Sequence, residues 1–263
     1  MGLRIMTSNI WGDYFNNPVG DREDLLLGVF ERFTPDVLGL QEVTKSWYGS
    51  SLLKRLSEGY AFAGTESYEN TNFVPMAYKK DLLLLAKGYE RLSGTKDRSK
   101  AITWAVLMGP ETWEKQQVFA VCNTHFWWKS GPEHDAVRKE NAKQLAALMG
   151  ALHQRYDCPV FAFGDMNTVL TSEVFQVYED HGIHHLYDLA EQRTDVSSHH
   201  GDPAMGPDGR LHGKKTQKDR RSSIDHMIGL GDGYKILKYQ VVEDQDALDA
   251  SDHSPVYVDV EFF

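Results

Sequence analysis

The chain has 263 residues, a formal net charge of −10 and a hydrophobic fraction of 41%. This is the composition of an ordinary globular protein, and it excludes a disordered, collagen-like or coiled-coil chain. The negative charge argues against a protein that coats nucleic acid, because that mode of binding requires a basic face. The two cysteines, Cys122 and Cys158, lie in apolar stretches and are too few for a disulfide framework, so we expect buried free thiols.

The sequence predicts neither a membrane anchor nor a secretory leader. Its longest apolar runs are far shorter than the ~20 residues that a membrane-spanning helix needs. The N-terminal residues enter a strand-like segment at once, without the apolar core of a signal peptide. We therefore expect a cytoplasmic protein, and no protein partner is evident from the sequence.

Short strand-like runs alternate with amphipathic segments along the chain. The spacing of apolar residues predicts strands at residues 3–8, 36–40, 72–78, 82–92, 101–108, 117–124, 160–163, 222–228, 234–242 and 255–262. Helical spacing appears at residues 21–33, 132–156 and 171–180. Asp21 is placed to cap the first helix, and Pro132 fits the first turn of the second.

The order of these elements indicates the fold class. The strands between residues 72 and 124 are expected to form a meander of mostly antiparallel strands. Residues 193–221 are polar and rich in glycine and histidine, which is typical of a long surface loop. The mixture of helices and antiparallel strands favours a layered α/β sandwich, and we expect a single domain over residues 1–263.

Polar residues suited to metal and phosphate chemistry lie at the ends of the predicted strands. They are Asn9, Glu42, His125, Asp165, Asn167, Asp225, Asp252 and His253. Each has an ordinary reading when taken alone: a carboxylate after a strand is usually a solvated turn residue, and a lone histidine is more often part of a core. Because strand ends converge at one edge of a sheet, the repeated coincidence instead predicts one shared cleft.

Such a set of side chains supports hydrolysis of a phosphoester. Glu42, with Asn9 and Asp252 nearby, supplies the hard oxygen ligands that Mg²⁺ prefers. Asp165 is suited to orient or deprotonate the attacking water. His253 is suited to act as a general base or to bind phosphate.

The remaining members of the set have supporting roles. Asn167 and His125 are suited to donate hydrogen bonds to the developing negative charge. Asp225, a buried carboxylate, is suited to fix the tautomer of His253. No Cys/His spacing indicates structural zinc.

The ordered motifs SNIWG, LQEV, NTHF, GDMN, SIDH and SDHSP resemble those of the endonuclease/exonuclease/phosphatase superfamily, which includes deoxyribonuclease-I-like enzymes. The resemblance runs from Asn9 to His253. It implies a four-layer α/β/β/α sandwich of two mainly antiparallel sheets flanked by helices. It also implies Mg²⁺ or Mn²⁺ at one end of the sheets, the residue roles given above, and a pairing of Asp225 with His253. Whether Asp165 or His253 is the base stays open.

Four further residues are candidates for substrate binding. Trp127 and Trp128 follow NTHF, where many bacterial relatives have a small polar residue, and they could form a stacking platform or pack against the next helix. Lys100 stands where relatives often carry arginine and could contact phosphate as a point charge. Trp11 lines the cleft or simply packs.

Two other features have competing readings. The segment from Arg210 to Arg221 contains six basic residues and one acid, so it could grip an anionic substrate or be a solvated loop. The histidine pairs at 184–185 and 199–200 match no ligand spacing, and we interpret them as surface loop.

The sequence therefore predicts a Mg²⁺-dependent phosphodiesterase or phosphatase. The alternative is an endonuclease or exonuclease that acts on DNA or RNA by the same mechanism, which the net charge does not favour. A catalytically dead binding protein on the same fold would lack Glu42 or the GDMN motif, and both are present. The sequence identifies the substrate only as a phosphate ester.

Overall fold

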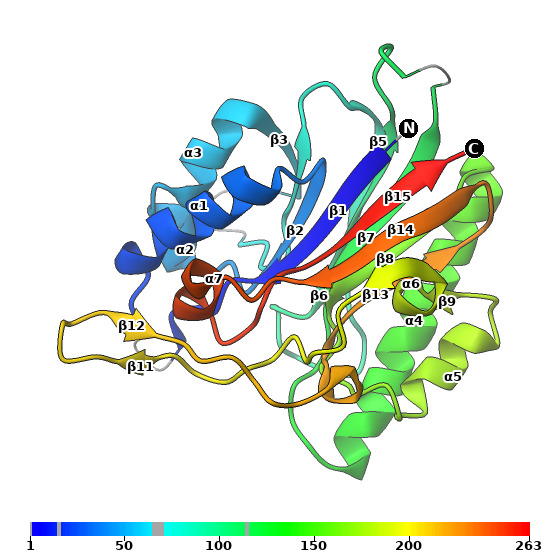
Figure 1. Ribbon diagram of the computed structural model, residues 1–263. Coiled ribbons are helices and arrows are strands. Elements are labelled where there is room, and N and C mark those ends of the chain that lie inside the picture. The colour runs from blue at the N-terminus through cyan, green and yellow to red at the C-terminus, as the bar shows by residue number, and fades with distance from the viewer. Residues whose placement is uncertain (1, 15–16, 65–70, 114–115) are drawn as a thin grey trace.

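The computed structural model describes residues 2–14, 17–64, 71–113 and 116–263, and in it two large sheets pack face to face (Figure 1). The seven-stranded sheet has the order β10 (Ala190–Arg193), β14 (Tyr234–Val241), β15 (Val256–Phe262), β1 (Gly2–Asn9), β2 (Val37–Gln41), β4 (Met76–Lys79) and β3 (Tyr60–Ala63). The six-stranded sheet has the order β5 (Leu83–Arg91), β6 (Ala101–Met108), β7 (Val118–His125), β8 (Val160–Asp165), β13 (Asp225–Leu230) and β9 (His184–His185). Most neighbouring strands are antiparallel, as the sequence predicted.

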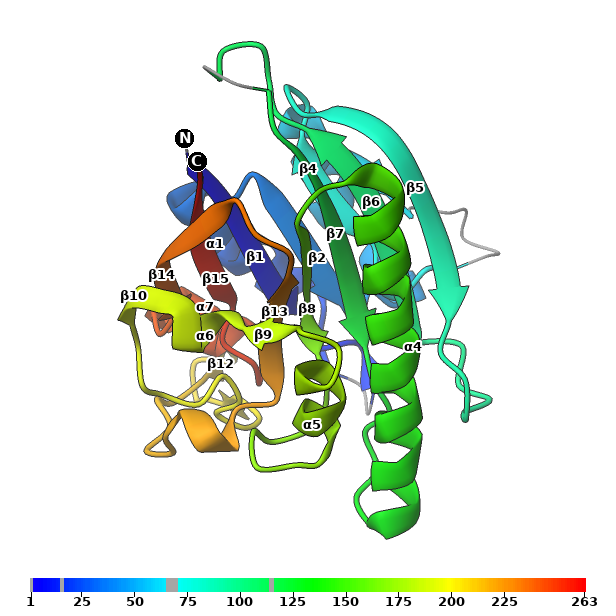
Figure 2. The same ribbon diagram turned by 90° about the vertical axis from the view of Figure 1, so that its right-hand side faces the viewer.

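Helices cover the outer face of each sheet (Figure 2). The seven-stranded sheet carries α1 (Glu23–Phe33), α2 (Lys45–Gly49), α3 (Leu52–Gly59) and α7 (Gln245–Ala250). The six-stranded sheet carries α4 (Pro132–Tyr156) and α5 (Val174–Glu179), and the short α6 (Leu186–Leu189) joins β9 to β10. The result is the predicted four-layer α/β/β/α sandwich.

Three apolar clusters separate the four layers. One lies between the sheets and contains Ile5, Val37 and Phe163, and the other two lie beneath the helices of each outer face. Strand β1 shows how the sequence specifies this: Ile5 points to the inner cluster, whereas the next residue, Met6, points to the helices. Side chains alternate between the faces, so a strand buried on both faces reads as a nearly continuous apolar run.

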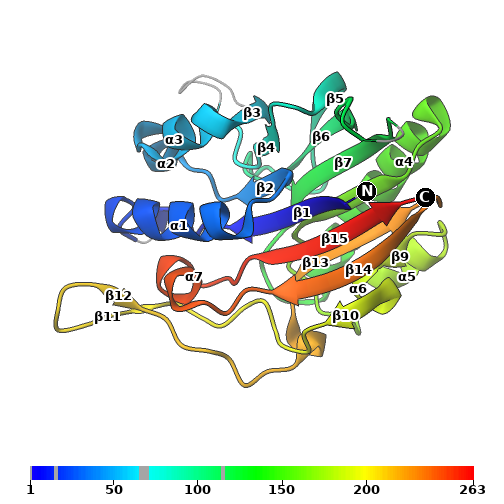
Figure 3. The same ribbon diagram turned by 45° about the horizontal axis from the view of Figure 1, so that its top comes forward.

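Several expectations from the sequence are corrected in detail. Residues 72–78 do not join the following meander, because β4 pairs with β2 and β3 in the other sheet. Asp21 does not cap α1; it lies in a 3-10 turn (Gly20–Arg22), and the N-cap position is Arg22. The surface loop over 193–221 contains a hairpin of β11 (Ala204–Met205) and β12 (Leu211–His212), which projects beyond the sandwich (Figure 3).

Other expectations are confirmed. Helix α4 has the predicted bounds, with Pro132 in its first turn. Cys122 and Cys158 are both buried and free. None of the helices in the described part of the chain combines the length and apolar character of a membrane-spanning segment.

Gly39 allows the two sheets to approach closely near the site. It lies in β2, and a Cβ atom there would stand 2.3 Å from the ring of Phe163 and 2.8 Å from the amide of Asn123. That amide donates hydrogen bonds to the carbonyl oxygens of Leu40, Val74 and Pro75, so it has little freedom to move. A side chain at position 39 would therefore push the sheets apart.

We expect Gly39→Ala to lower the free energy of unfolding by at least about 2 kcal/mol, because it overpacks this contact. Gly28→Ala is the matched control. Gly28 lies in α1, and a Cβ atom there would meet no described side chain within 4 Å, so the substitution should stabilise the helix by about 0.5–1 kcal/mol. Urea denaturation followed by tryptophan fluorescence measures both, and equal values for the two variants would contradict the close contact.

Candidate active site

The predicted polar residues meet at one edge of the two sheets, and the strand directions explain why. Strand β1 runs parallel to β2, and β7 runs parallel to β8, so the ends that carry Asn9, Glu42, His125 and Asp165 lie on the same side. Strands β13 and β15 run antiparallel to β8 and β1 and therefore begin at that side. Their first residues, or those just before them, are Asp225, Asp252 and His253.

Asp165 is the centre of this group. Its Oδ2 accepts a hydrogen bond of 3.0 Å from Asn9 Nδ2, and its Oδ1 accepts one of 2.9 Å from the backbone N–H of Asn167. The Nε2 atoms of His125 and His253 lie 3.4 and 3.8 Å from Oδ2. Burial is the main cause that raises the pKa of Asp165, and His253 acts against it.

Asp225 holds His253 in place. Its Oδ2 lies 2.8 Å from His253 Nδ1 and also accepts a hydrogen bond of 2.7 Å from Ser198 Oγ. Because a carboxylate only accepts, this contact assigns the proton to Nδ1 and directs Nε2 toward Asp165. Burial acts to lower the pKa of His253, but the charges of Asp225 and Asp252 raise it well above its ordinary value.

Glu42 joins the group through Asn9. Its two oxygens accept hydrogen bonds of 3.2 Å from Asn9 Nδ2 and 2.7 Å from the Gly12 N–H. Among the described residues, no cationic side chain forms an ion pair with this carboxylate. Burial, and then the charge of Glu42, raise the pKa of Asp252 to about 6.

These residues fit a divalent metal ion. A carboxylate has about four sites that can accept, and Glu42 uses two of them for neutral donors. Glu42 and Asp252 are only partly buried, and the charge of Glu42 acts on Asp252, so a cation would offset the repulsion between the two acidic groups. Two further sets of three histidine and aspartate side chains have ligand atoms within 4.8 Å of one another, and both include His253; one adds Asp165 and Asp225, and the other adds His199 and Asp252.

Three residues of the site have a left-handed backbone. Trp11, Glu42 and Asn167 have φ angles of 52°, 61° and 47°, which residues other than glycine rarely adopt. The N–H of Trp11 is bound to Asn9 Oδ1 and that of Asn167 to Asp165 Oδ1, so the site's own side chains hold the strained turns. Strain of this kind is typical of functional sites.

Lys100 lies deeper than the sequence suggested. It is buried, and its Nζ is 2.7 Å from His125 Nε2. Burial lowers the pKa of Lys100. Nδ1 of His125 is buried and has no hydrogen-bond partner in the described part of the chain. In this structure Lys100 therefore contacts the site through His125.

The three candidate tryptophans are in different environments. Trp11 packs against the guanidinium of Arg22, and Trp127 donates from Nε1 to His134 Nδ1 at 2.9 Å. Trp128 is 56% exposed, next to Trp127, with Lys129 Nζ near both rings. Of the three, Trp128 presents the most open surface to a ligand.

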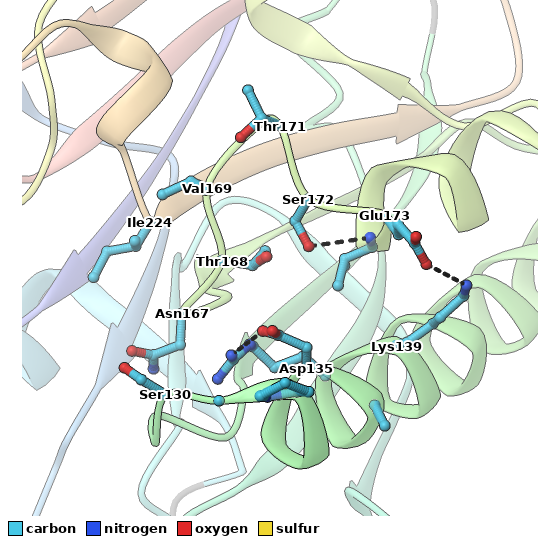
Figure 4. Close-up of a pocket in the computed structure, with 15 residues that line it drawn as sticks. Ser130, Asp135, Lys139, Asn167, Thr168, Val169, Thr171, Ser172, Glu173 and Ile224 are labelled. Atoms are coloured by element: carbon cyan, nitrogen blue, oxygen red, sulfur yellow. Dashed lines mark hydrogen bonds and ion pairs between the residues drawn. The ribbon is translucent and has the colours of Figure 1, made fainter.

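A cavity of about 760 Å³ opens beside Asn167, between the loop after β8 and the start of α4 (Figure 4). Its charged side chains neutralise each other, because Asp135 pairs with Arg138 and Lys139 pairs with Glu173 at 3.1 Å. Its other polar groups are mainly hydroxyls and amides. The hydroxyl side chains are Ser130, Thr168, Thr171 and Ser172. The cavity thus suits a neutral, hydrogen-bonding group.

Sequence reasoning missed two residues that position the site. Arg22 is buried and donates to the carbonyl oxygens of Ile10, Trp11 and Ala250, so it fastens the loops after β1 and before Asp252. Ser251 Oγ donates to the carbonyl oxygen of Asn9 at 2.7 Å. An arginine at a helix start is ordinary in sequence, so no signal pointed to Arg22, whereas Ser251 is the first residue of the SDHSP motif.

The histidine pairs are also not simple surface loop. His185 Nε2 lies 3.1 Å from Nδ1 of the fully buried His226, whose Nε2 lies 2.7 Å from the Thr168 carbonyl oxygen. His199 lies against His253, with ring centroids 4.8 Å apart. Of the four histidines in the two pairs, only His184 is exposed. The signal for His199 was its place in the long loop that precedes Asp225.

Comparison with known proteins identifies the family of this arrangement. The sequence matches the Endonuclease/Exonuclease/phosphatase family over residues 6–253, and members of this family are phosphoester hydrolases that generally depend on divalent metal ions. No curated protein matches the chain.

Solved structures with the same fold include a family member from Bacteroides vulgatus, with 20% identity, full coverage of both chains and a TM-score of 0.76. A mannosyl-6-phosphatase from Bacteroides thetaiotaomicron has 18% identity, covers 99% of this chain and 100% of its own, and gives a TM-score of 0.70. TDP2 of D. rerio, complexed with a single-strand DNA product, has 18% identity, 99% coverage of each chain and a TM-score of 0.66.

The buried pair of His185 and His226 predicts a loss of stability in acid. Burial lowers the pKa of His226 to about 4, whereas an unfolded histidine titrates near 6.5. Between these values the unfolded state binds more protons, so the free energy of unfolding falls as the pH falls, by up to about 1.4 kcal/mol per pH unit for each proton. His226→Gln should flatten this slope between pH 6.5 and 4, measured by urea denaturation.

The exposed His184→Gln variant is the control and should keep the slope of the unsubstituted protein. An unchanged slope in His226→Gln would show that the pKa of His226 is the same in the folded and the unfolded state.

Proposed function

We propose that this chain, which belongs to the Endonuclease/Exonuclease/phosphatase family of phosphoester hydrolases, cleaves a phosphate ester by metal-dependent attack of water. The observation that carries the proposal is the position of Asp165. One carboxylate is within reach of Asn9, Asn167, His125 and His253, which come from both sheets. A water near Asp165 Oδ2 would be near two imidazoles as well, so the proton of the nucleophile has an acceptor at hand.

The residues then divide the work of the reaction. Asp165 orients the attacking water, and the proton goes either to Asp165 or to Nε2 of neutral His253, since Asp165 Oδ2 and His253 Nε2 are 3.8 Å apart. Asp225 keeps His253 in the required tautomer. Asn167 donates a hydrogen bond to the phosphoryl oxygens as negative charge develops. His125 can donate one from Nε2 only when the 2.7 Å contact of that nitrogen with Lys100 Nζ opens.

Asn9, Glu42 and Asp252 would hold the divalent cation, Mg²⁺ or Mn²⁺. The cation supplies Lewis-acid stabilisation of the phosphoryl group. The oxygen-rich set of Asn9, Glu42 and Asp252 agrees with the preference of these hard ions for amide and carboxylate ligands.

The cavity beside Asn167 favours a small substrate with a neutral alcohol part. Its acidic and basic side chains are already paired, so it offers no excess positive charge to a second phosphate. Its hydroxyl groups suit a polyhydroxylated alcohol. Trp128 does not line the cavity, but it is exposed two residues before Ser130, which does, and it could meet an apolar face of a larger ligand. The mannosyl-6-phosphatase with the same fold supports a sugar phosphate as one such substrate.

A nuclease activity is the second candidate. Lys214, Lys215 and Lys218 are exposed on the loop between β12 and the site, whereas Arg220 and Arg221 are paired with Asp188 and Asp219. Three exposed lysines could follow a nucleic-acid backbone. The TDP2 structure with a DNA product supports this candidate, and the net charge of −10 does not.

We expect activity to be lost in EDTA and restored by Mg²⁺ or Mn²⁺. Glu42→Gln should raise the Mg²⁺ concentration for half-maximal activity at least about tenfold, because a ligand charge is removed. Asp165→Asn should lower kcat by about 10²–10⁴ even at saturating Mg²⁺, since it cannot accept the proton. Initial rates against metal concentration measure both.

Glu191→Gln is the control, because Glu191 is exposed on β10 and far along the chain from the site residues. Full activity in EDTA would exclude the metal role, and unchanged rates in both site variants would exclude this assignment of the site.

A substrate panel separates the two candidates. At equal Mg²⁺ and low salt, we expect kcat/KM to be higher for hexose phosphates and small phosphodiesters than for single-stranded DNA or RNA. Trp128→Ala should raise KM for the preferred small ester, since it removes the exposed platform. A higher kcat/KM on the polymer, reduced by Lys214→Ala and Lys215→Ala, would favour the nuclease instead.

A further inference from the structure

His199 lies beside the proposed catalytic residues without a role in the reaction described above. It is carried on the loop between β10 and β11, and that loop is fastened to the segment before β15. The N–H of His200 donates to the Asp252 carbonyl oxygen at 3.1 Å, and the N–H of Ser254 donates to the Ser198 carbonyl oxygen at 2.7 Å. These hydrogen bonds, made by the residues on either side of His199, place His199 opposite His253 in an isolated β-bridge.

The side chains of His199, Asp252 and His253 converge on one point. The Nε2 atoms of the two histidines each lie 3.9 Å from Asp252 Oδ2, and the three ligand atoms lie within 4.8 Å of one another. These separations are too long for hydrogen bonds. Around a tetrahedral ion with bonds of about 2.0–2.1 Å, the ligand atoms would stand ~3.3 Å apart, so small side-chain rotations would close the set.

The donor chemistry differs from that of the proposed magnesium site. Two imidazole nitrogens and one carboxylate oxygen form a set that suits Zn²⁺, Co²⁺ or Ni²⁺, whereas Mg²⁺ prefers oxygen alone. Asp225 holds Nδ1 of His253, so Nε2 is the ring nitrogen that faces the site, and it can exchange its proton for a metal ion. No hydrogen bond engages the ring nitrogens of His199 in the described part of the chain, so both it and His253 can bind a metal without breaking one at Nε2.

We propose that His199, Asp252 and His253 form a binding site for a transition-metal ion such as Zn²⁺, which shares Asp252 with the magnesium site and adds two histidines to it. The His199 side chain is about one-third exposed, which gives the ion access from solvent. Water completes the coordination, as is usual where a zinc ion has three protein ligands.

Occupation of this site inhibits the enzyme. The ion takes His253 Nε2 away from the proton transfer and Asp252 away from the magnesium site, so Zn²⁺ and turnover are mutually exclusive. This consequence rests on the proposed function, whereas the binding itself does not. The site would make the enzyme sensitive to free zinc while it works with magnesium.

Direct binding is the deciding measurement. Isothermal titration with Zn²⁺ and visible absorption with Co²⁺ are performed on the metal-free protein, with His199→Asn, His199→Gln and the control His184→Asn. We expect one site whose affinity falls at least about tenfold in both His199 variants and stays unchanged in His184→Asn. Circular dichroism checks that each variant is folded, and the loop position of His199 makes loss of the fold unexpected.

Inhibition is measured separately, as the Zn²⁺ concentration that halves Mg²⁺-supported activity. His199→Asn should raise that concentration at least about tenfold while keeping the rate without Zn²⁺. Equal Zn²⁺ affinity in His199→Asn and the unsubstituted protein would overturn the metal site. If the protein hydrolyses no phosphate ester but loses Zn²⁺ binding in the His199 variants, the proposed function fails and the metal site stands.

Discussion

The hydrogen bond from Asn9 to Asp165 joins the two sheets at the edge where the chemistry is placed. Asn9 ends β1 of the seven-stranded sheet, and Asp165 ends β8 of the six-stranded sheet. All the other site residues are defined by their relation to this pair, since Glu42 binds Asn9 and both histidines face Asp165. The site therefore exists only while the sheets are held in this register.

Buried polar groups beneath the site maintain that register. Gln41 Nε2 donates to Thr7 Oγ1 and to Asn123 Oδ1. Asn123 donates back to the carbonyl oxygens of Leu40 in β2 and of the two residues just before β4. Such groups are costly when unpaired, so a shift of one sheet against the other would be penalised by every lost hydrogen bond. Gly39 keeps the contact short, and Arg22 fastens the loops above it. A rigid frame of this kind is what strained residues such as Glu42 require.

Much of the fold and most of the candidate site could be read from local patterns. Apolar spacing located α4 to the residue, and strand-end polar residues gave the set that the structure brings together. Prediction failed where partners are distant in sequence. The strand at residues 72–78 joined the other sheet, and the polar loop hid His199, which is 54 positions before the residue it contacts. The roles of Asp165, His253 and the metal ligands remain predictions.

The sequence by itself determined which side chains are available and which strands they follow, because strand periodicity and motif order are local properties of the chain. It also determined the family. Only the tertiary structure decided that Lys100 lies behind His125, that Trp127 is used in packing while Trp128 is open, and that His199 stands beside His253. The physical reason is that burial and contact depend on which distant segments pack together, and a pattern of neighbours along one chain does not encode that pairing.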